Sequence, residues 1–185
     1  MRKLIVSEWM SLDGVFDAQA MGDWWGPYDS DERAAHIQGE IGSAGAFVLG
    51  RRTYEMLAPY WSAMQNNEMG VAANLNGAPK YVVSSTLETA SWNNTTIIKR
   101  DVSKELEKLK QQAGGPLLVM GSAELVRSLS GDSLIDEYRF LVTPVVMGRG
   151  RRFFDDQTGT TKLTLTNSKT LKSGVLALSY TPAAR

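Results

Sequence analysis

The chain has 185 residues, of which 43% are hydrophobic and 22% charged, a composition that predicts one globular domain with a substantial core. Twenty basic residues balance twenty acidic ones, so we expect no binding to nucleic acid or to an anionic membrane surface. Cysteine is absent and His36 is the one histidine, which excludes disulfides, thiol nucleophiles and cysteine-ligated zinc and leaves no histidine cluster for a metal. No signal peptide and no apolar run of the ~20 residues that span a bilayer is present, so we expect a cytoplasmic protein.

Strands and helices alternate through the first two-thirds of the sequence. The apolar runs predict strands at residues 2–9, 45–49, 80–86, 95–100 and 116–121. Capping residues, charge patterns and glycine stops predict helices from Asp29 or Ser30 to about Ile41, from the "GRRT" motif at 50–53, within 101–115 and within 122–131. Residues 17–30 and 65–78 are predicted as loops, with a short helix as an alternative within the second.

The last third of the sequence changes pattern. Residues 134–147 predict a long strand interrupted by Pro144, and 161–170 and 174–181 predict two more without intervening helices. The alternation before this point implies right-handed parallel crossovers with helices on both sheet faces, and the final pair implies an antiparallel edge. We therefore predict one α/β domain over residues 1–185.

Three predicted strands end in residues that suit a phosphorylated ligand. These ends are Gly50, Arg51, Arg52 and Thr53; Ser84, Ser85 and Thr86; and Gly121, Ser122, Ala123 and Glu124. Ligands of open α/β sheets bind beyond the carboxyl ends of parallel strands, and helix starts present unpaired N–H groups to anions. Two forked guanidinium groups beside hydroxyl groups suit two phosphates, as in NADPH. Ordinary surface turns remain an alternative for each segment taken alone.

The order of these motifs resembles the dihydrofolate reductase superfamily over about residues 2–180. The resemblance rests on "SLDG" at 11–14, "GRRTYE" at 50–55, "KYVVSST", "LLVMGSAELV" and the run from Pro144 to Phe153. It is nearest to the reductase domain of the bifunctional riboflavin-pathway deaminase-reductase and its stand-alone relatives. The resemblance implies a three-layer dihydrofolate-reductase-like fold, NADPH as hydride donor, and a homodimer.

The resemblance also implies roles for individual residues. It assigns the three segments above to the cofactor, with Lys99 or Arg100 as loose additions near the adenosine. Asp13 and Gly14 match the mobile loop beside the nicotinamide. Ala34 occupies the position at which dihydrofolate reductases carry an acidic residue, which argues against dihydrofolate as the substrate.

The proton donor and the substrate contacts are left open by the sequence. Asp13, Asp31 and Glu32 are the candidate acids, together with solvent water. Trp24, Trp25 and Tyr54 are the candidate substrate contacts, although the tryptophans could equally form a packed lid. Trp9 is predicted to be core. Arginines in the loop after Pro144 could bind a substrate phosphate or lie in solvent; they are Arg149, Arg151 and Arg152.

The favoured function is an NADPH-dependent reductase of a small heterocycle, carbonyl or imine, for example a ribosylaminopyrimidine phosphate. Alternatives are a nucleotide-binding module without catalysis, dihydrofolate reductase proper, and a phosphoryl-transfer enzyme. The last is ranked lowest because the chain has no "GK[ST]" motif.

Overall fold

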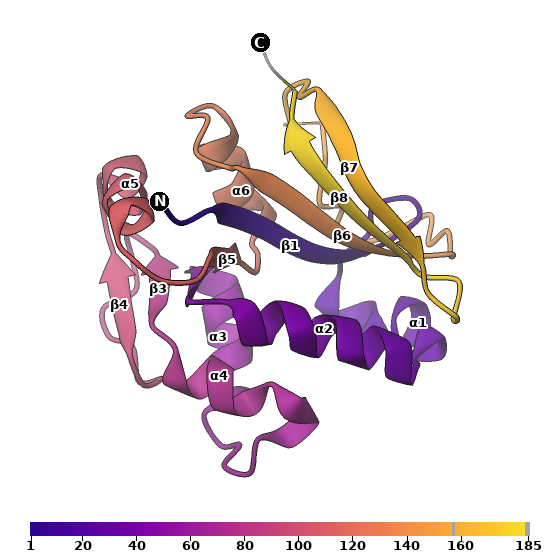
Figure 1. Cartoon of the computed structure of the whole chain (residues 1–185), viewed down its shortest axis with the longest axis horizontal. Coiled ribbons are helices and arrows are strands. Elements are labelled where there is room, and N and C mark those ends of the chain that lie inside the picture. The colour runs from indigo at the N-terminus through magenta and orange to yellow at the C-terminus, as the bar shows by residue number, and fades with distance from the viewer. Residues whose placement is uncertain (157, 184–185) are drawn as a thin grey trace. The chain divides into compact units, whose positions relative to one another are not determined.

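The computed structural model describes residues 1–156 and 158–183 (Figure 1). Within these residues, eight strands form one sheet in the order β4-β3-β2-β5-β1-β6-β8-β7. Spatial proximity divides the chain into two compact units, a first unit of Met1–Val6 and Ile37–Asp136, and a second unit of Ser7–His36 and Glu137–Arg185. The predicted α/β class, with a mostly parallel sheet and an antiparallel edge, is confirmed.

The elements follow each other along the chain as predicted, with a few additions. The strands are β1 Leu4–Ser11, β2 Ala46–Gly50, β3 Lys80–Val83, β4 Thr95–Ile98, β5 Leu117–Val119, β6 Glu137–Thr143, β7 Leu163–Thr170 and β8 Leu176–Pro182. The α-helices are α1 Met21–Trp24, α2 Asp31–Ser43, α3 Arg51–Trp61, α4 Ala72–Gly77, α5 Val102–Gln111 and α6 Ala123–Ser130. The described part of the chain also contains the short 3-10 helices η1 Ala18–Ala20, η2 Gly26–Tyr28 and η3 Glu68–Gly70.

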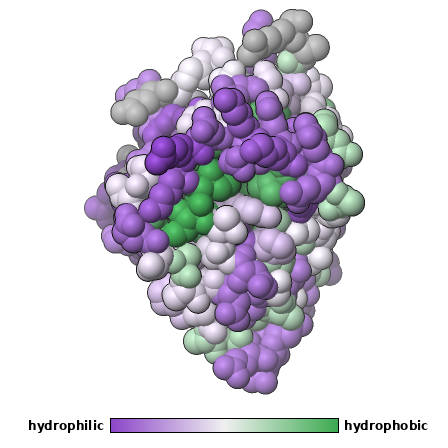
Figure 2. Space-filling view, turned by 90° about the vertical axis from the view of Figure 1, so that its left-hand side faces the viewer, coloured by the Kyte–Doolittle hydropathy of each residue, from purple (hydrophilic) through white to green (hydrophobic). Residues whose placement is uncertain are grey.

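The parallel strands of the first unit are buried on both faces. All five residues of β2 are buried, as expected for a parallel strand covered on each side. Alternate side chains such as Phe47, Leu49 and Val82 pack against α3, α4 and the end of α2. Figure 1 shows α3 and α4 on one side of these strands and α5 and α6 on the other. The prediction of helices on both faces is therefore confirmed. Figure 2, which faces the side that carries β4 and α5 in Figure 1, shows apolar surface between hydrophilic side chains.

The second unit contains the antiparallel strands β6, β8 and β7. The β7–β8 hairpin closes through Leu171 N–H to Val175 O at 2.8 Å, with Gly174 at a positive φ of 80°. The strand predicted to reach residue 147 ends at Thr143 instead, because Pro144 has no N–H to continue the ladder. The terminal antiparallel pair itself is confirmed.

The loop predicted at residues 17–30 contains three short helical turns, η1, α1 and η2. Asp17 opens the first of these turns by accepting a hydrogen bond from Gln19 N–H at 3.1 Å. Of the two residues predicted to cap the next helix, Ser30 accepts from Arg33 N–H at 3.2 Å. Across the described ranges, no helix has both the length and the apolar character needed to cross a membrane.

Candidate functional site

The three strand ends that were predicted to bind phosphate belong to neighbouring strands of the first unit. Strand β2 lies between β3 and β5, and Gly50, its last residue, is in register with Val83, the last residue of β3. Gly50 N–H donates to the carbonyl of Gly121 at 3.0 Å, which joins the end of β2 to the segment after β5. The residues that follow all three strands therefore lie along one edge of the sheet.

The start of helix α3 is open to a ligand at this edge. Gly50 is the N-cap residue, and no side chain of the described residues caps the helix. The N–H groups of Arg51, Arg52 and Thr53, in the first turn, therefore have neither an intrahelical carbonyl nor a capping side chain. Such groups, with the positive end of the helix dipole, attract anions.

A glycine is required at position 50 by close packing against the start of α6. A Cβ atom there would lie 2.6 Å from Ser122 Oγ and 3.1 Å from Ser122 N. The start of α3 consequently packs directly against Ser122 at the start of α6, with no room for a side chain at position 50.

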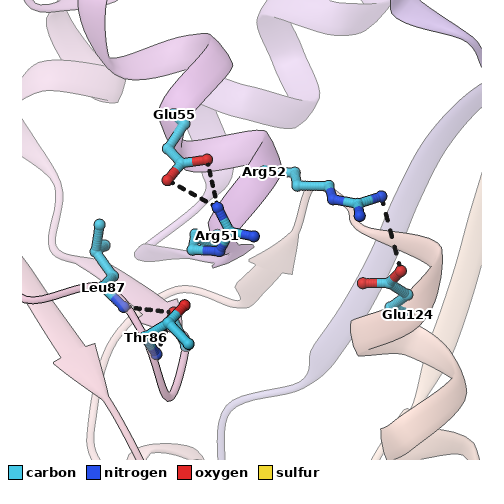
Figure 3. Close-up of polar contacts among 7 residues, drawn as sticks. Arg51, Arg52, Glu55, Thr86, Leu87 and Glu124 are labelled. Atoms are coloured by element: carbon cyan, nitrogen blue, oxygen red, sulfur yellow. Dashed lines mark hydrogen bonds and ion pairs between the residues drawn. The ribbon is translucent and has the colours of Figure 1, made fainter.

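The two arginines flank this edge, each in a weak surface ion pair (Figure 3). Arg51 contacts Glu55, one turn later on α3, at 2.9 Å, and Arg52 reaches Glu124 on α6 at 3.8 Å. All four side chains are at least 40% exposed. Exposed pairs contribute only about 0–1 kcal/mol, so either guanidinium can turn to a phosphate at little cost.

The hydroxyl segment after β3 divides into two roles. Ser84 is buried, and its Oγ accepts hydrogen bonds from Thr86 N–H at 3.2 Å and Leu87 N–H at 2.9 Å. Its hydroxyl is therefore used by the turn, which corrects its assignment as a ligand contact. Ser85 and Thr86 are exposed and remain candidates.

The segment after β5 begins with a backbone conformation that favours glycine, since Gly121 has a φ of 74°. The Gly121–Ser122 peptide bond is cis. Ser122 caps α6 by accepting from Leu125 N–H at 3.4 Å. Ala123 is buried and Glu124 exposed, so the candidate contacts from this segment are its backbone and Glu124.

Tyr54, proposed above as a substrate contact, belongs to the core of the first unit. It is 5% exposed, and its hydroxyl accepts a hydrogen bond from Trp92 N–H at 3.1 Å. Because both the ring and the hydroxyl are occupied, we reassign Tyr54 to a structural role. Lys99, a loose candidate, lies on the surface and pairs with Glu88 at 3.3 Å.

In the second unit, Asp13 holds the "SLDG" loop in place through its hydrogen bonds and does not act as a proton donor. Its carboxylate accepts hydrogen bonds from Ser11 Oγ at 2.7 Å, Met147 N–H at 3.0 Å and Gly148 N–H at 2.9 Å. Arg152 adds an ion pair at 3.4 Å. These donors, Ser11 first, hold the pKa of Asp13 well below its ordinary value of 3.8. An acid catalyst needs a raised pKa, so the structure speaks against Asp13 as the proton donor.

We expect Asp13→Asn to release this loop. In asparagine, an NH₂ group replaces one of the two carboxylate oxygens, and it cannot accept a hydrogen bond from the N–H groups that it faces. The loss of charged hydrogen bonds should lower the free energy of unfolding by about 2 kcal/mol. Urea denaturation measures the loss, and amide exchange should accelerate at Met147 and Gly148. Asp23→Asn, at an exposed aspartate of α1, is the matched control.

The contribution of Asp13 also has a defined pH dependence. Because its pKa is lowered in the folded state, its stabilisation is present above pH 3.8 and is lost as the pH falls further. Wild type and Asp13→Asn should therefore converge in stability only in strong acid. A stability difference that disappears near neutral pH would contradict the anchoring role.

Glu32 is likewise occupied by contacts. Lys169 Nζ lies 2.7 Å from one carboxylate oxygen, and Lys172 N–H donates to the other at 2.8 Å. The hydrogen bond from Lys169, and then that from Lys172, lower the pKa of Glu32, so this residue is also a poor proton donor. Asp31 is exposed in the first turn of α2 and remains a candidate.

The two predicted substrate tryptophans are packed inside the second unit. Trp24 is 2% exposed and donates from Nε1 to Asp17 O at 3.0 Å, and Trp25 is 8% exposed. The packed-lid alternative is the one that the structure supports. Trp9, predicted to be core, is only half-buried and stacks on Trp25.

The remaining second-unit residues lie near the Asp13 loop. Gly14, a predicted cofactor contact, has a φ of 80°, and its carbonyl accepts from Phe153 N–H at 2.9 Å. Arg149 and Arg151 are exposed, and the Arg151 guanidinium lies 5.9 Å from the Phe16 ring. Arg152 is committed to Asp13, so it is removed from the candidate phosphate contacts.

Comparisons with known proteins agree with this architecture. The chain is 25% identical over 181 residues to the uncharacterized protein YyaP of Bacillus subtilis, covering 97% of this chain and 94% of that protein. A putative riboflavin biosynthesis protein from Shewanella sp. PV-4 superposes with a TM-score of 0.74 at 17% identity, covering 98% of this chain and 99% of that one. A pyrimidine reductase-like protein from Corynebacterium diphtheriae gives 0.70 at 12% identity, covering 100% and 93%.

A larger relative has the same fold in one part of its length. The deaminase/5-amino-6-(5-phosphoribosylamino)uracil reductase of Thermotoga maritima superposes with a TM-score of 0.67 at 14% identity, covering 98% of this chain and 57% of that one. The model of the RibD C-terminal domain family matches residues 2–177. By this match over nearly its whole length, the chain belongs to the RibD C-terminal domain family, which is a family of reductases.

Proposed function

We propose that this protein is an NADPH-dependent reductase of a small heterocyclic, carbonyl or imine substrate, such as a ribosylaminopyrimidine phosphate. The observation that carries the proposal is the uncapped start of α3, flanked by Arg51 and Arg52 and packed against the start of α6. Family membership supports the reductase class, and the likeness to the Thermotoga 5-amino-6-(5-phosphoribosylamino)uracil reductase supports the substrate class.

The residues at this edge fit a dinucleotide with two phosphate positions. The first-turn N–H groups of α3 and the backbone around Gly121 would bind the pyrophosphate, which needs donors without charge of their own. Arg51, with Ser85 and Thr86 from the neighbouring strand end, would bind the ribose 2′-phosphate. When bound, NADPH supplies the hydride, so the chain needs no nucleophilic side chain.

The proton that accompanies the hydride would come from Asp31 or from water. Asp13 and Glu32 are both held in the ionised form by their hydrogen bonds, which removes two of the three carboxyl groups first considered. Ala34 is exposed on α2 and offers no carboxylate for a pterin ring, so dihydrofolate reductase proper is not favoured.

The test is cofactor preference. We expect NADPH to raise the melting temperature of the wild type more than NADH, because ligand binding to the native state adds stability in proportion to affinity. Arg51→Ala and Arg52→Ala should each weaken NADPH binding by about 10-fold, as expected for a lost charged hydrogen bond, with little effect on NADH. Arg149→Ala, which removes the same charge from the second unit, should change neither.

Two outcomes decide against the proposal. Equal stabilisation by NADPH and NADH would contradict the proposed site for the ribose 2′-phosphate. NADPH binding without oxidation, across a panel of pyrimidines, pterins and imines, would favour the alternative of a nucleotide-binding module without catalysis.

A further inference from the structure

The second unit contains a stack of three flat groups in the order Trp9, Trp25 and Arg33. The rings of Trp9 and Trp25 are nearly parallel, with centroids 4.3 Å apart and an interplanar angle of 4°. The guanidinium carbon of Arg33 lies 4.0 Å from the Trp25 ring centroid. Both neighbours are at stacking distance from the same ring, so they occupy its opposite faces, and Trp25 has no face left for a ligand.

The inner two layers of the stack are held firmly. Arg33 is 5% exposed and donates from one nitrogen to Trp25 O at 2.7 Å and from another to Asp29 at 2.8 Å. Trp24 packs against Trp25 edge-to-face, with centroids 5.9 Å apart. The support beneath Trp9 is therefore rigid.

Trp9 is the outer layer and is only half-buried. Within residues 1–156 and 158–183, Trp25 is the one aromatic ring that contacts it. Trp9 lies on β1, two residues before Ser11, whose hydroxyl donates to Asp13 in the "SLDG" loop. A partly exposed indole on a rigid stack is a suitable platform for a second flat ring, since aromatic rings gain from offset stacking.

We propose that Trp9 binds the planar heterocycle of the substrate by stacking. The inference rests on the proposed reductase function, and it moves the substrate contact from the buried Trp24 and Trp25 to Trp9. The occupant is a pyrimidine-type ring, because a single indole face matches one flat conjugated ring and because the similar structures include a pyrimidine reductase-like protein and a 5-amino-6-(5-phosphoribosylamino)uracil reductase. Stacking of a base on an aromatic side chain strengthens binding by about 5-fold or more, and a leucine at this position would lose this gain.

The test compares uracil with 5,6-dihydrouracil, which carries the same ring carbonyls and N–H groups on a puckered ring. Binding is followed by NMR titration of the protein saturated with NADP⁺. The wild type should prefer uracil, Trp9→Phe should retain that preference, and Trp9→Leu should weaken uracil binding at least about 5-fold. Trp61→Leu, at a half-buried tryptophan of α3, should leave uracil binding unchanged.

A second measurement is made on the wild type and uses the conservative variant Trp9→Phe only to assign the indole signals. The H5 and H6 protons of uracil should show intermolecular NOEs to the indole protons of Trp9. These indole signals are identified because they are missing from the spectrum of Trp9→Phe. The inference would be overturned if the wild type and Trp9→Leu bound uracil with equal affinity, or if the wild type did not bind uracil. NOEs from uracil to other tryptophans alone would also overturn it. Loss of NADPH-induced stabilisation in the wild type would instead overturn the reductase proposal, so the two failures are distinguishable.

Discussion

Gly50→Ala should abolish useful NADPH binding and destabilise the protein. The new Cβ atom would lie 2.6 Å from Ser122 Oγ, closer than Cβ atoms approach other atoms in folded proteins, and 3.1 Å from the Ser122 backbone nitrogen, which is a tight contact. Relief requires the starts of α3 and α6 to separate, which lengthens the 3.0 Å hydrogen bond from Gly50 N–H to Gly121 O. We expect overpacking to cost about 2 kcal/mol, and the loss of two charged hydrogen bonds to phosphate to weaken NADPH binding on the order of 100-fold.

The compensating variant makes this prediction specific. Ser122→Gly removes two of the three nearest atoms, Oγ and Cβ, so Gly50→Ala/Ser122→Gly should regain most of the affinity. Ser122→Gly alone should cost only a few tenths of a kcal/mol, because glycine is tolerated at a helix N-cap. Isothermal titration with NADPH measures all three variants. Wild-type affinity in Gly50→Ala would show that this edge is not the cofactor site.

Lys80→Met should cause the largest loss of stability in the molecule, about 3–5 kcal/mol. Lys80 is 0% exposed, and its ammonium donates to the carbonyls of Leu75 at 2.7 Å, Ala78 at 2.8 Å and Asn76 at 3.2 Å. These are carbonyls at the end of α4, where a cation also complements the helix dipole. A methionine fills similar volume but leaves these three carbonyls, of Leu75, Ala78 and the partly buried Asn76, without the ammonium donor.

The charge of Lys80 persists at neutral pH despite its burial. Burial lowers the pKa of Lys80 to about 8, so the ammonium form, with its three donors, still predominates at pH 7. Thermal and urea unfolding measure the loss in Lys80→Met. Lys108→Met, on the exposed face of α5, is the control and should leave the melting temperature unchanged. Similar unfolding of both variants would contradict the structural role of the buried lysine.

Local signals in the sequence were sufficient for most of the fold. Buried parallel strands are short apolar runs, and helices begin at capping residues such as Ser30 and stop at glycines. These elements can therefore be predicted from residues that are close together in the sequence. The segment from 17 to 30 was missed because its turns are three or four residues long, below the length at which periodicity is visible. The end of β6 was misplaced although Pro144 marked it.

The candidate site was predictable only in part, for a physical reason. Composition and motif order were enough to predict that residues suited to binding phosphate follow the strands. They also showed that the chain has no cysteine for catalysis. Only the tertiary structure decided which strand ends adjoin, because the order β3-β2-β5 depends on long-range pairing.

The same limit applies to each side-chain role that was revised. The acids Asp13 and Glu32 are held by residues 134 and 140 positions away, at Met147 and Lys172. Tyr54 and Trp25 are removed from any ligand role by burial, and Trp9 is left partly exposed. The sequence by itself thus determined the elements and the kinds of chemistry present. Burial and protonation, which depend on every group packed around a side chain, were decided by the tertiary structure alone.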